Sequence, residues 1–180
     1  MPSTVLSFLL VSLLSSDASA AGDDRDLLSF ARWAGDHPTR AFRDMLVEAR
    51  LYGVVPIDQL LRSASDWRLC HADPFAIPPS AQWPAVRTTL ELLQHVRQAG
   101  ILSSFEVVSA YRGPALNACA GGAKQSAHLR AFAVDLLLPP DTDLTLLYTF
   151  WRDHGADWNM GLGRYPSGRI HIDTAGYRSW

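Results

Sequence analysis

The sequence predicts an α+β fold in which a small antiparallel sheet is flanked by helices and preceded by a helical N-terminal layer. Apolar residues recur at helical spacing through much of the first hundred residues, whereas the short β-type runs begin only at Phe105. Strands and helices then follow one another in mixed order, which is typical of α+β domains. A chain of 180 residues with 48% hydrophobic and 19% charged residues is long and apolar enough for one folded domain.

Three helical segments are expected before the first long connector. The first follows Asp24, a candidate N-cap, and the second spans Ala41 to Leu51. Pro56 at a first turn then begins the third, Ile57 to Ala64. None of the three carries residues with obvious chemistry, so they are expected to form a packing layer under the sheet.

The remaining elements are helices and strands in mixed order. An extended connector, Asp73–Pro79, leads into an amphipathic helix over Trp83–Gln98 that Gly100 ends. The later elements are expected, in chain order, to be a strand at Phe105–Ser109, one or two helical turns at Pro114–Cys119, a strand at Phe132–Leu138, a helix at Leu144–Asp153, and two strands at Met160–Arg164 and Arg169–Asp173 joined by the turn Tyr165–Gly168.

The charge balance disfavours nucleic acid as a partner. Sixteen Lys and Arg residues against 18 Asp and Glu residues give a formal net charge of −2, and no basic stripe stands out. We therefore expect no nucleic-acid partner. We also expect a monomer that does not insert stably into a membrane.

Residues 1–20 have the pattern of an export signal. Val5–Leu14 is almost wholly apolar, and Ala18-Ser19-Ala20 offers a cleavage site of small residues. The apolar run is too short for a typical transmembrane helix, and no lipid-accepting cysteine follows it. We expect a mature bacterial protein that is periplasmic or secreted. A buried N-terminal helix is the alternative, since no Lys or Arg precedes the run.

The two cysteines, Cys70 and Cys119, bear on the same question. In an exported chain an even pair predicts one disulfide, whereas in a cytosolic protein the same pair would more often be two buried thiols. Neither cysteine has a Cys or His partner at zinc-finger spacing, so a cysteine metal site is not expected.

A pair of polar residues in the last expected strand, His171 and Asp173, suggests a functional face. Side chains at i and i+2 of a strand point the same way, so both residues should face one cleft while Ile170 and Ile172 face the core. An ordinary surface strand with two polar residues would give the same pattern.

A second pair, His128 and Asp135, gives a stronger signal. Asp135 lies within an apolar run, where an ionised carboxylate is costly unless it binds a metal or pairs with a cation such as Arg112 or Arg130. Two imidazoles and one carboxylate can hold Zn²⁺ in three positions and leave the fourth for water, which is the arrangement of hydrolytic sites. The sequence therefore predicts one zinc ion per chain, held by His128, Asp135 and His171.

The motifs around these residues resemble a family of zinc peptidases. They run in the order Ser109-Ala-Tyr111-Arg112, Asn117, Gly121-Gly122-Ala123, Ser126-Ala-His128 and Ala133-Val-Asp135, and they close with Gly161-Leu-Gly163-Arg-Tyr165-Pro166, His171-Ile-Asp173 and Arg178-Ser-Trp180. The family includes bacterial D-alanyl-D-alanine carboxypeptidases and murein endopeptidases, and it shares its metal-site fold with hedgehog signalling domains. The closing stretch is similar to the periplasmic murein peptidase branch, and the resemblance covers roughly the last eighty residues.

The resemblance implies roles for individual residues. It implies that His128, Asp135 and His171 bind zinc. It also implies that Arg112 binds the substrate and stabilises the developing oxyanion, and that Ser126 hydrogen-bonds the substrate or orients the loop. A structural salt bridge is the alternative role of Arg112.

Two positions depart from the family pattern. Ala131 stands where the family commonly has glycine, three residues after the first zinc histidine. Gly168 stands where many members have Glu or Asp, three residues before the last zinc histidine, so the general base must come from elsewhere. Asp173 is the nearest candidate, either as the catalytic base or as a group that orients His171, and Asp157 is a weaker one.

These interpretations divide the chain into an export signal (1–20), a helical layer with its connector (21–79) and a zinc peptidase domain (80–180). We expect a zinc-dependent peptidase that hydrolyses peptide bonds in peptidoglycan stem peptides, as a carboxypeptidase or as an endopeptidase. A non-catalytic zinc-containing peptidoglycan-binding module is the alternative, because Gly168 replaces the usual acid. A purely structural zinc domain would need a fourth protein ligand, for which the sequence offers no convincing residue.

Overall fold

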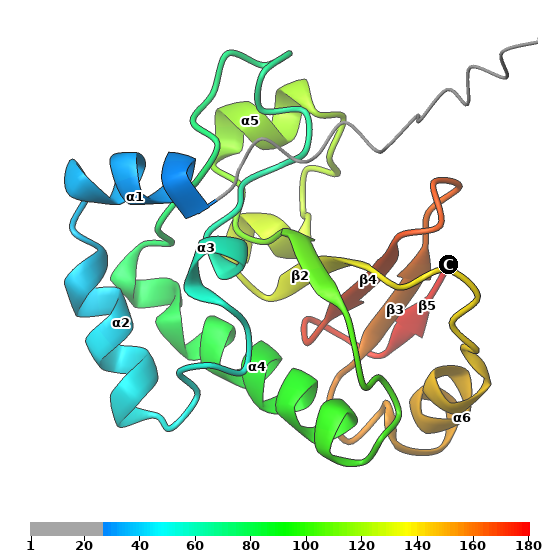
Figure 1. Ribbon diagram of the computed structural model, residues 1–180. Coiled ribbons are helices and arrows are strands. Elements are labelled where there is room, and N and C mark those ends of the chain that lie inside the picture. Colours follow the sequence, from blue (N-terminus) through cyan, green and yellow to red (C-terminus); the bar gives the residue numbers. More distant parts are fainter. Residues whose placement is uncertain (1–26) are drawn as a thin grey trace, which may run out of the picture.

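The computed structural model describes residues 27–180 of the chain (Figure 1). The expected export signal at 1–20 and the candidate N-cap Asp24 lie outside these residues. Within the described part, a five-stranded sheet with the strand order β1-β2-β4-β3-β5 is surrounded by helices, which confirms the α+β prediction. None of the described helices is long and apolar enough to cross a membrane.

The elements follow the expected order along the chain. The helices are α1 (Leu27–Gly35), α2 (Thr39–Glu48), α3 (Ile57–Leu60), α4 (Trp83–Gln98), α5 (Pro114–Cys119) and α6 (Thr145–His154), with short 3-10 helices η1 (Ser80–Gln82) and η2 (Ala127–Arg130). The strands are β1 (Glu106–Ser109), β2 (Ala133–Leu137), β3 (Gly161–Arg164), β4 (Ile170–Asp173) and β5 (Arg178–Ser179). The bounds of α4 and α5 are those predicted, and the two 3-10 helices and β5 were not predicted.

The sheet is antiparallel except at one edge. β2 pairs with β1 and β4, and β4 pairs with β3, all in antiparallel orientation. β5 pairs in parallel with β3, so the prediction of a wholly antiparallel sheet was wrong at this edge. A strand of two residues is too short to show an alternating pattern, and the sequence therefore gave no sign of it.

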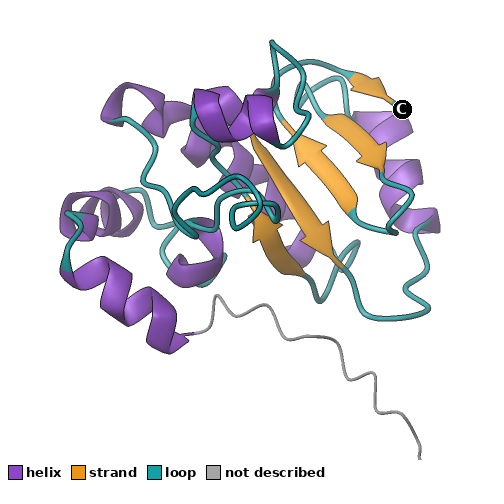
Figure 2. Ribbon diagram, turned by 90° about the horizontal axis from the view of Figure 1, so that it is seen from above, coloured by secondary structure: helices purple, strands orange, loops and turns teal. Residues whose placement is uncertain are grey.

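The N-terminal helices and the sheet share one hydrophobic core. In Figure 1, α1 and α2 lie on one side of the sheet, and α4 runs beneath the sheet toward α6. The rings of His95 in α4 and Phe150 in α6 have centroids 5.4 Å apart. Figure 2 shows the strands from above with helices around them. α2 packs on α4 through Phe42 and Trp83, whose ring centroids are 5.7 Å apart. The buried cluster includes residues of both parts, among them Phe42, Leu46, Phe75, Leu92, Leu93, Val96, Leu136, Ile170 and Ile172.

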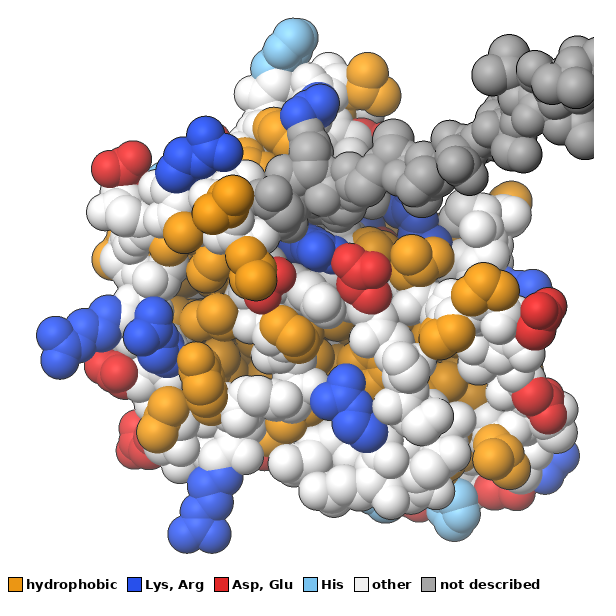
Figure 3. Space-filling model, viewed as in Figure 1, with side chains coloured by type: hydrophobic (Ala, Val, Ile, Leu, Met, Phe, Trp, Pro, Cys, Tyr) orange, Lys and Arg blue, Asp and Glu red, His pale blue; other side chains and the backbone are white. Residues whose placement is uncertain are grey.

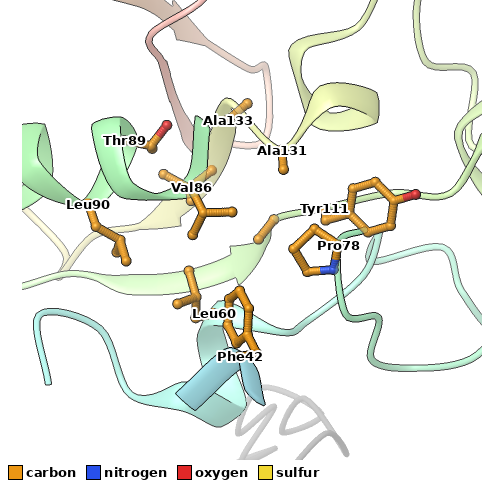
Figure 4. Close-up of a pocket in the computed structure, with 11 residues that line it drawn as sticks. Phe42, Leu60, Pro78, Val86, Thr89, Leu90, Tyr111, Ala131 and Ala133 are labelled. Carbon is orange, nitrogen blue, oxygen red and sulfur yellow. The ribbon is translucent and has the colours of Figure 1, made fainter. Parts of the chain in front are cut away.

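Part of the junction between the helical layer and the sheet is apolar. Figure 4 shows Phe42 and Leu60 from the N-terminal helices around the same small cavity as Val86 of α4 and Ala133 of β2. Polar contacts also join the helical layer to β1: Gln59 Oε1 accepts from the backbone N–H of Val107 at 3.1 Å, and Arg62 Nη1 donates to the carbonyl oxygen of Val107 at 3.1 Å.

A disulfide joins Cys70 to Cys119, as predicted, across 49 residues of sequence. Cys70 lies in the turns that follow α3, and Cys119 is the last residue of α5. The bond therefore ties the end of the helical layer to the segment that leads into η2 and β2.

The surface has no concentrated positive charge on the face drawn in Figure 3. Lys and Arg side chains stand apart from one another on that face, with Asp and Glu side chains among them. This distribution agrees with the small formal net charge of −2.

Candidate metal centre

Strand pairing brings two of the predicted ligands together. In the β2–β4 pair, Asp135 stands directly opposite His171. Both residues are buried, and the alternate residues Ile170 and Ile172 belong to the hydrophobic core, as the alternation predicted. The third residue, His128, comes from η2, which precedes β2 in the chain.

The three side chains converge on one point, and their ligand atoms could hold a metal ion. His128 Nε2 lies 3.2 Å from both Asp135 Oδ1 and His171 Nδ1, and the last two atoms lie 2.9 Å apart. In a tetrahedral zinc site with bonds of about 2.0–2.1 Å, neighbouring ligand atoms stand about 3.3 Å apart. The separations are therefore close to those that one metal ion imposes on three of its ligands.

Hydrogen bonds at the other nitrogen of each ring select the atoms that converge. His128 Nδ1 lies 2.6 Å from the carbonyl oxygen of Ala110, which can only accept, so Nδ1 carries the proton and Nε2 keeps its lone pair. His171 Nε2 donates to Asp173 Oδ2 at 2.8 Å, which leaves Nδ1 as the position for a proton or a metal ion. Two such nitrogens and a carboxylate oxygen in contact attract a cation, so this set fits a divalent metal such as zinc.

The surroundings shift the pKa values of the cluster in different directions. Burial lowers the pKa of His128. Burial opposes the ionisation of Asp135, but its histidine neighbours and Arg112 outweigh burial and hold the pKa of this carboxyl well below its usual range. Burial also disfavours the charged form of His171, but hydrogen bonds to Asp135 and Asp173 outweigh it and raise the pKa of the ring. Without a metal, the surroundings therefore favour the ionised form of Asp135, and of the two rings they favour the protonated form of His171.

Arg112 lies beside this cluster and pairs with Asp135. Its Nη2 donates to Asp135 Oδ2, the oxygen that does not bond the histidines, and its Nε donates to Ser109 Oγ at 3.0 Å. The other cation considered for this carboxylate, Arg130, instead lies over the ring of Phe132, 5.5 Å from its centroid. Arg112 also lines the cleft that opens at His128 and His171.

The loop before η2 forms one wall of that cleft. Ser126 Oγ accepts a hydrogen bond from the backbone N–H of His128 at 3.3 Å and so caps η2. Asn117 Nδ2 donates to the carbonyl oxygen of Ala123 at 3.1 Å, and a Cβ on Gly122 would stand 2.2 Å from Asn117 Oδ1. The glycine thus permits the close approach that holds this wall in place.

Comparison with known protein families identifies the chain. A family model described as Peptidase M15 matches residues 58–173, which is more than half of the 180 residues. The chain belongs to the peptidase M15 family. M15 peptidases are typically metal-dependent metallopeptidases, and all three residues of the cluster lie inside the matched segment. Neither the curated proteins nor the solved structures contain a match to this sequence.

The two positions at which this M15 peptidase departs from the expected motif both have left-handed backbone conformations. Ala131 follows η2 with φ 58° and ψ 22°, a conformation that favours the glycine commonly found there. Gly168 has φ 83° in the turn between β3 and β4, where its N–H donates to the carbonyl oxygen of Tyr165 at 2.9 Å. Glycine at 168 therefore suits the turn, and this position supplies no carboxylate to the cleft.

Asp173, the candidate base of the M15 site, is fully buried and accepts hydrogen bonds on both oxygens. Oδ1 accepts from Ala175 N at 2.8 Å and from Arg178 Nη1 at 3.1 Å. Oδ2 accepts from His171 Nε2 at 2.8 Å and from Arg178 Nη2 at 2.7 Å. Burial opposes ionisation, but these donors outweigh it and lower the pKa of the carboxyl. The carboxylate thus contacts the ring nitrogen of His171 that does not face the cluster.

Asp157, the weaker candidate, lies away from these residues. Asp157 is exposed and lines a surface hollow together with His95 and Trp158. None of the three residues of the metal cluster lines this hollow.

Three residues of the M15 cleft received no role from the sequence: Tyr165, Arg178 and Trp180. The Tyr165 hydroxyl lies 3.5 Å from His171 Nδ1, and burial, together with the carboxylate of the cluster, raises its pKa to about 12. The Trp180 ring centroid lies 4.9 Å from that of His171, and a Cβ on Gly163 would stand 2.3 Å from the indole. The motifs contained these residues, but only the pairing of β3 with β4 and β5 brings them to the ligands.

Proposed function

We propose that this M15 peptidase is a zinc enzyme that hydrolyses peptide bonds in peptidoglycan stem peptides. The observation that supports it is the convergence of His128 Nε2, Asp135 Oδ1 and His171 Nδ1 beside a cleft that both rings line. Among residues 27–180 this group has three members, and a closed structural zinc site would need four protein ligands. Three ligands at an open cleft leave a position for reactants, as hydrolytic sites do.

The chain's own residues supply positioning and charge. When bound, zinc supplies Lewis-acid polarisation of the scissile carbonyl and a water nucleophile that is available near neutral pH. Arg112, fixed by Ser109 and Asp135, presents a guanidinium that suits the oxyanion developing on the substrate. Tyr165 keeps its hydroxyl proton at neutral pH because its pKa is about 12, so it acts in the cleft as a hydrogen-bond donor.

Of the two roles considered for Asp173, we assign it the orientation of His171. Its two oxygens already accept four hydrogen bonds, and its lowered pKa makes it a weak proton acceptor. A carboxylate behind a metal-binding histidine fixes the tautomer and direction of the ring. The described residues that line the cleft include no Asp or Glu, so solvent would take the proton of the nucleophile and would return a proton to the leaving amine.

We also propose that the mature protein acts in the periplasm or after secretion. The apolar run Val5–Leu14 and the small residues before position 20 motivate this location. The Cys70–Cys119 disulfide supports it, because disulfides persist in oxidising compartments and are rare in the cytosol.

The test is incubation of the purified protein with muropeptides, with and without a chelator, and identification of the products by mass. We expect release of a terminal D-alanine or cleavage of a cross-link, abolished by the chelator and restored by zinc. His128→Ala serves as the variant without a complete ligand set. Binding of muropeptides without any product would contradict the proposal and favour the non-catalytic binding module.

A further inference from the structure

We propose that Arg178 forms a binding subsite for a carboxylate of the substrate peptide, on the wall of the cleft that the metal cluster faces. The proposal rests on the proposed function, because the ligand is the peptide whose bond is cleaved. It adds a recognition site to the residues that hold the metal and stabilise the oxyanion.

One edge of the Arg178 guanidinium is fully used in the fold. Nη1 and Nη2 donate to the two oxygens of Asp173 at 3.1 Å and 2.7 Å, and Nη1 also donates to the carbonyl oxygen of Gly176 at 2.9 Å. The guanidinium carbon lies 5.1 Å from the centroid of the Trp180 ring. These contacts hold the guanidinium in one orientation before any ligand binds, which reduces the entropy lost on binding.

The other edge of the same guanidinium is free. Within the part of the chain that the structure describes, the Nε–H and the second Nη2–H of Arg178 have no acceptor. These two N–H groups lie side by side and point the same way, which is the fork that binds both oxygens of a carboxylate. The side chain is 43% exposed and lines the cleft, so this edge can be reached by substrate.

Arg112 does not offer the same fork. Its Nε and Nη2 donate to Ser109 and Asp135, and its side chain is only 12% exposed. Nε and Nη2 of Arg112 thus already donate to Ser109 and to the metal-ligand carboxylate, whereas the Nε–H of Arg178 and one of its Nη2–H groups stay available to a ligand.

The charges of the cleft favour an anion at Arg178. The two guanidinium groups balance the carboxylates of Asp135 and Asp173, so a divalent ion in the cluster leaves the cleft net positive. Asp173 also links Arg178 to His171 through its hydrogen bonds to both. The carboxylate subsite is therefore held at a fixed distance from the metal cluster. A substrate carboxylate bound at Arg178 would place the peptide bond at the matching distance from that carboxylate beside the cluster, and this bond would be the one cleaved.

A stem peptide contains two kinds of backbone carboxylate that could bind there. One is the free carboxylate at its C-terminus, and the other is an α-carboxylate inside the peptide, next to a bond made through a side chain. Both have the same chemistry, so the experiment has to block each in turn.

The test measures binding of three synthetic stem pentapeptides by calorimetry. The first has both carboxylates free, the second has its C-terminus amidated, and the third has its internal α-carboxylate amidated. Each is titrated into the protein with its metal removed, so that no hydrolysis interferes, and KM and kcat are then measured with the zinc-loaded protein. Four proteins are compared: wild type, Arg178→Gln, Arg178→Lys and Arg164→Gln, which removes an exposed arginine of β3.

We expect one of the two amidations to weaken binding to wild type and to Arg164→Gln about tenfold or more, because a charge-assisted paired hydrogen bond is lost. The amidation that does so identifies the carboxylate. Arg178→Gln should bind all three peptides alike and show a raised KM for the free acid. Arg178→Lys should keep only part of the preference, because it keeps the charge and loses the fork.

Two results would overturn the subsite. Wild type could bind the three peptides equally, or Arg178→Gln could keep the wild-type preference. If Arg178→Gln binds the amidated peptides as wild type does, the variant is folded. If Arg178→Gln binds no peptide, the decision passes to Arg178→Lys. A full wild-type preference of Arg178→Lys for the free carboxylate over its amide would then overturn the proposal. Muropeptide hydrolysis without any acid–amide preference would leave the proposed function intact, whereas absence of both hydrolysis and binding would overturn both proposals.

Discussion

At the scale of single residues, the nitrogen that each histidine offers to a metal is decided by the contact at its other nitrogen. The Ala110 carbonyl engages Nδ1 of His128, and Asp173 engages Nε2 of His171, so the two rings present different nitrogens to Asp135. The orientation of the second ring thus depends on a buried carboxylate, and this dependence can be measured.

Replacing Asp173 with Asn is expected to lower zinc affinity about 10–100-fold, because the ring of His171 loses its charged acceptor. Saturating zinc should then restore much of the peptidase rate. Zinc affinity is measured by competition with a chromophoric chelator, and Asp157→Asn is the matched control. If Asp173 were instead the general base, the rate would fall about 10²–10⁴-fold at full zinc occupancy.

Zinc is expected to stabilise the protein more at pH 8 than at pH 6. The pKa of His171 is raised above its ordinary value of 6.5. The protonated ring therefore stabilises the metal-free fold at pH values below 6.5, and this stabilisation is lost as the pH rises through the pKa of the folded state. A proton on Nδ1 also competes with the metal, so metal binding strengthens as pH rises. Thermal unfolding with and without zinc at the two pH values measures this, and equal stabilisation at both would contradict it.

The residues in the site differ in how far the sequence could predict them. Asp135 was predicted because an ionised carboxylate in an apolar strand needs a partner, and the structure provides three, His128, His171 and Arg112. The choice of Arg112 over Arg130 as the cation, and the place of Arg178, could not be predicted. Both depend on which backbone positions the folded sheet brings together, and a single sequence does not contain that information.

At the scale of elements, the glycines of β3 decide how close the neighbouring side chains can lie to the strand. Gly161 stands opposite Asp173, and Gly163 stands opposite His171. A Cβ on Gly161 would be 2.2 Å from Asp173 Oδ2, and one on Gly163 would be 2.3 Å from the Trp180 ring. The strand thus leaves room for the carboxylate that orients the ligand and for the aromatic wall of the cleft.

Gly161→Ala is expected to destabilise the fold by about 1–3 kcal/mol, as overpacking does, and to lower zinc affinity as well. The Asp173 carboxylate cannot move without losing the hydrogen bonds that hold it, whereas the half-exposed Trp180 can turn away from an added methyl group. Gly163→Ala should therefore affect zinc affinity less. Urea unfolding and the chelator assay compare Gly161→Ala and Gly163→Ala with the control Gly35→Ala, where an added Cβ meets no atom within 4 Å. Equal zinc affinity of the three variants would contradict the predicted order.

Helices were easier to predict than the edge of the sheet. α4 has a long amphipathic pattern, a proline in its first turn and Gly100 beyond its end, and its bounds were predicted correctly. β5 has two residues and is held by backbone hydrogen bonds to β3. Its position depends on a partner strand fourteen or more residues earlier in the chain, which local pattern does not record.

At the scale of the whole molecule, the Cys70–Cys119 disulfide closes a segment of 49 residues between the helical layer and the cleft wall. In the chain-entropy account, removing it with Cys70→Ser and Cys119→Ser costs about 4 kcal/mol of unfolding free energy. The double variant and the oxidised wild type are compared by urea unfolding, with reduced wild type as the control. A loss below about 1 kcal/mol would show that the unfolded chain is already constrained without the bond.

The division into a helical layer at 21–79 and a peptidase domain at 80–180 remains a prediction. The family match begins at residue 58, within α3, and the buried cluster joins Phe42 and Phe75 to the strands. Amphipathic spacing indicates that a helix has a buried face, but it does not indicate which element covers that face. The extent of the shared core therefore becomes visible only in the folded chain.

The pairing of β2 with β4 is also a condition for a complete set of metal ligands. Asp135 and His171 are 36 residues apart in the chain and become neighbours only when the two strands align in register. A slip of one residue would turn every side chain of a strand to the opposite face and separate the pair. A chain in which the two strands have not yet paired therefore has no complete ligand set, and binding of a metal ion by these residues would be coupled to the pairing of the strands.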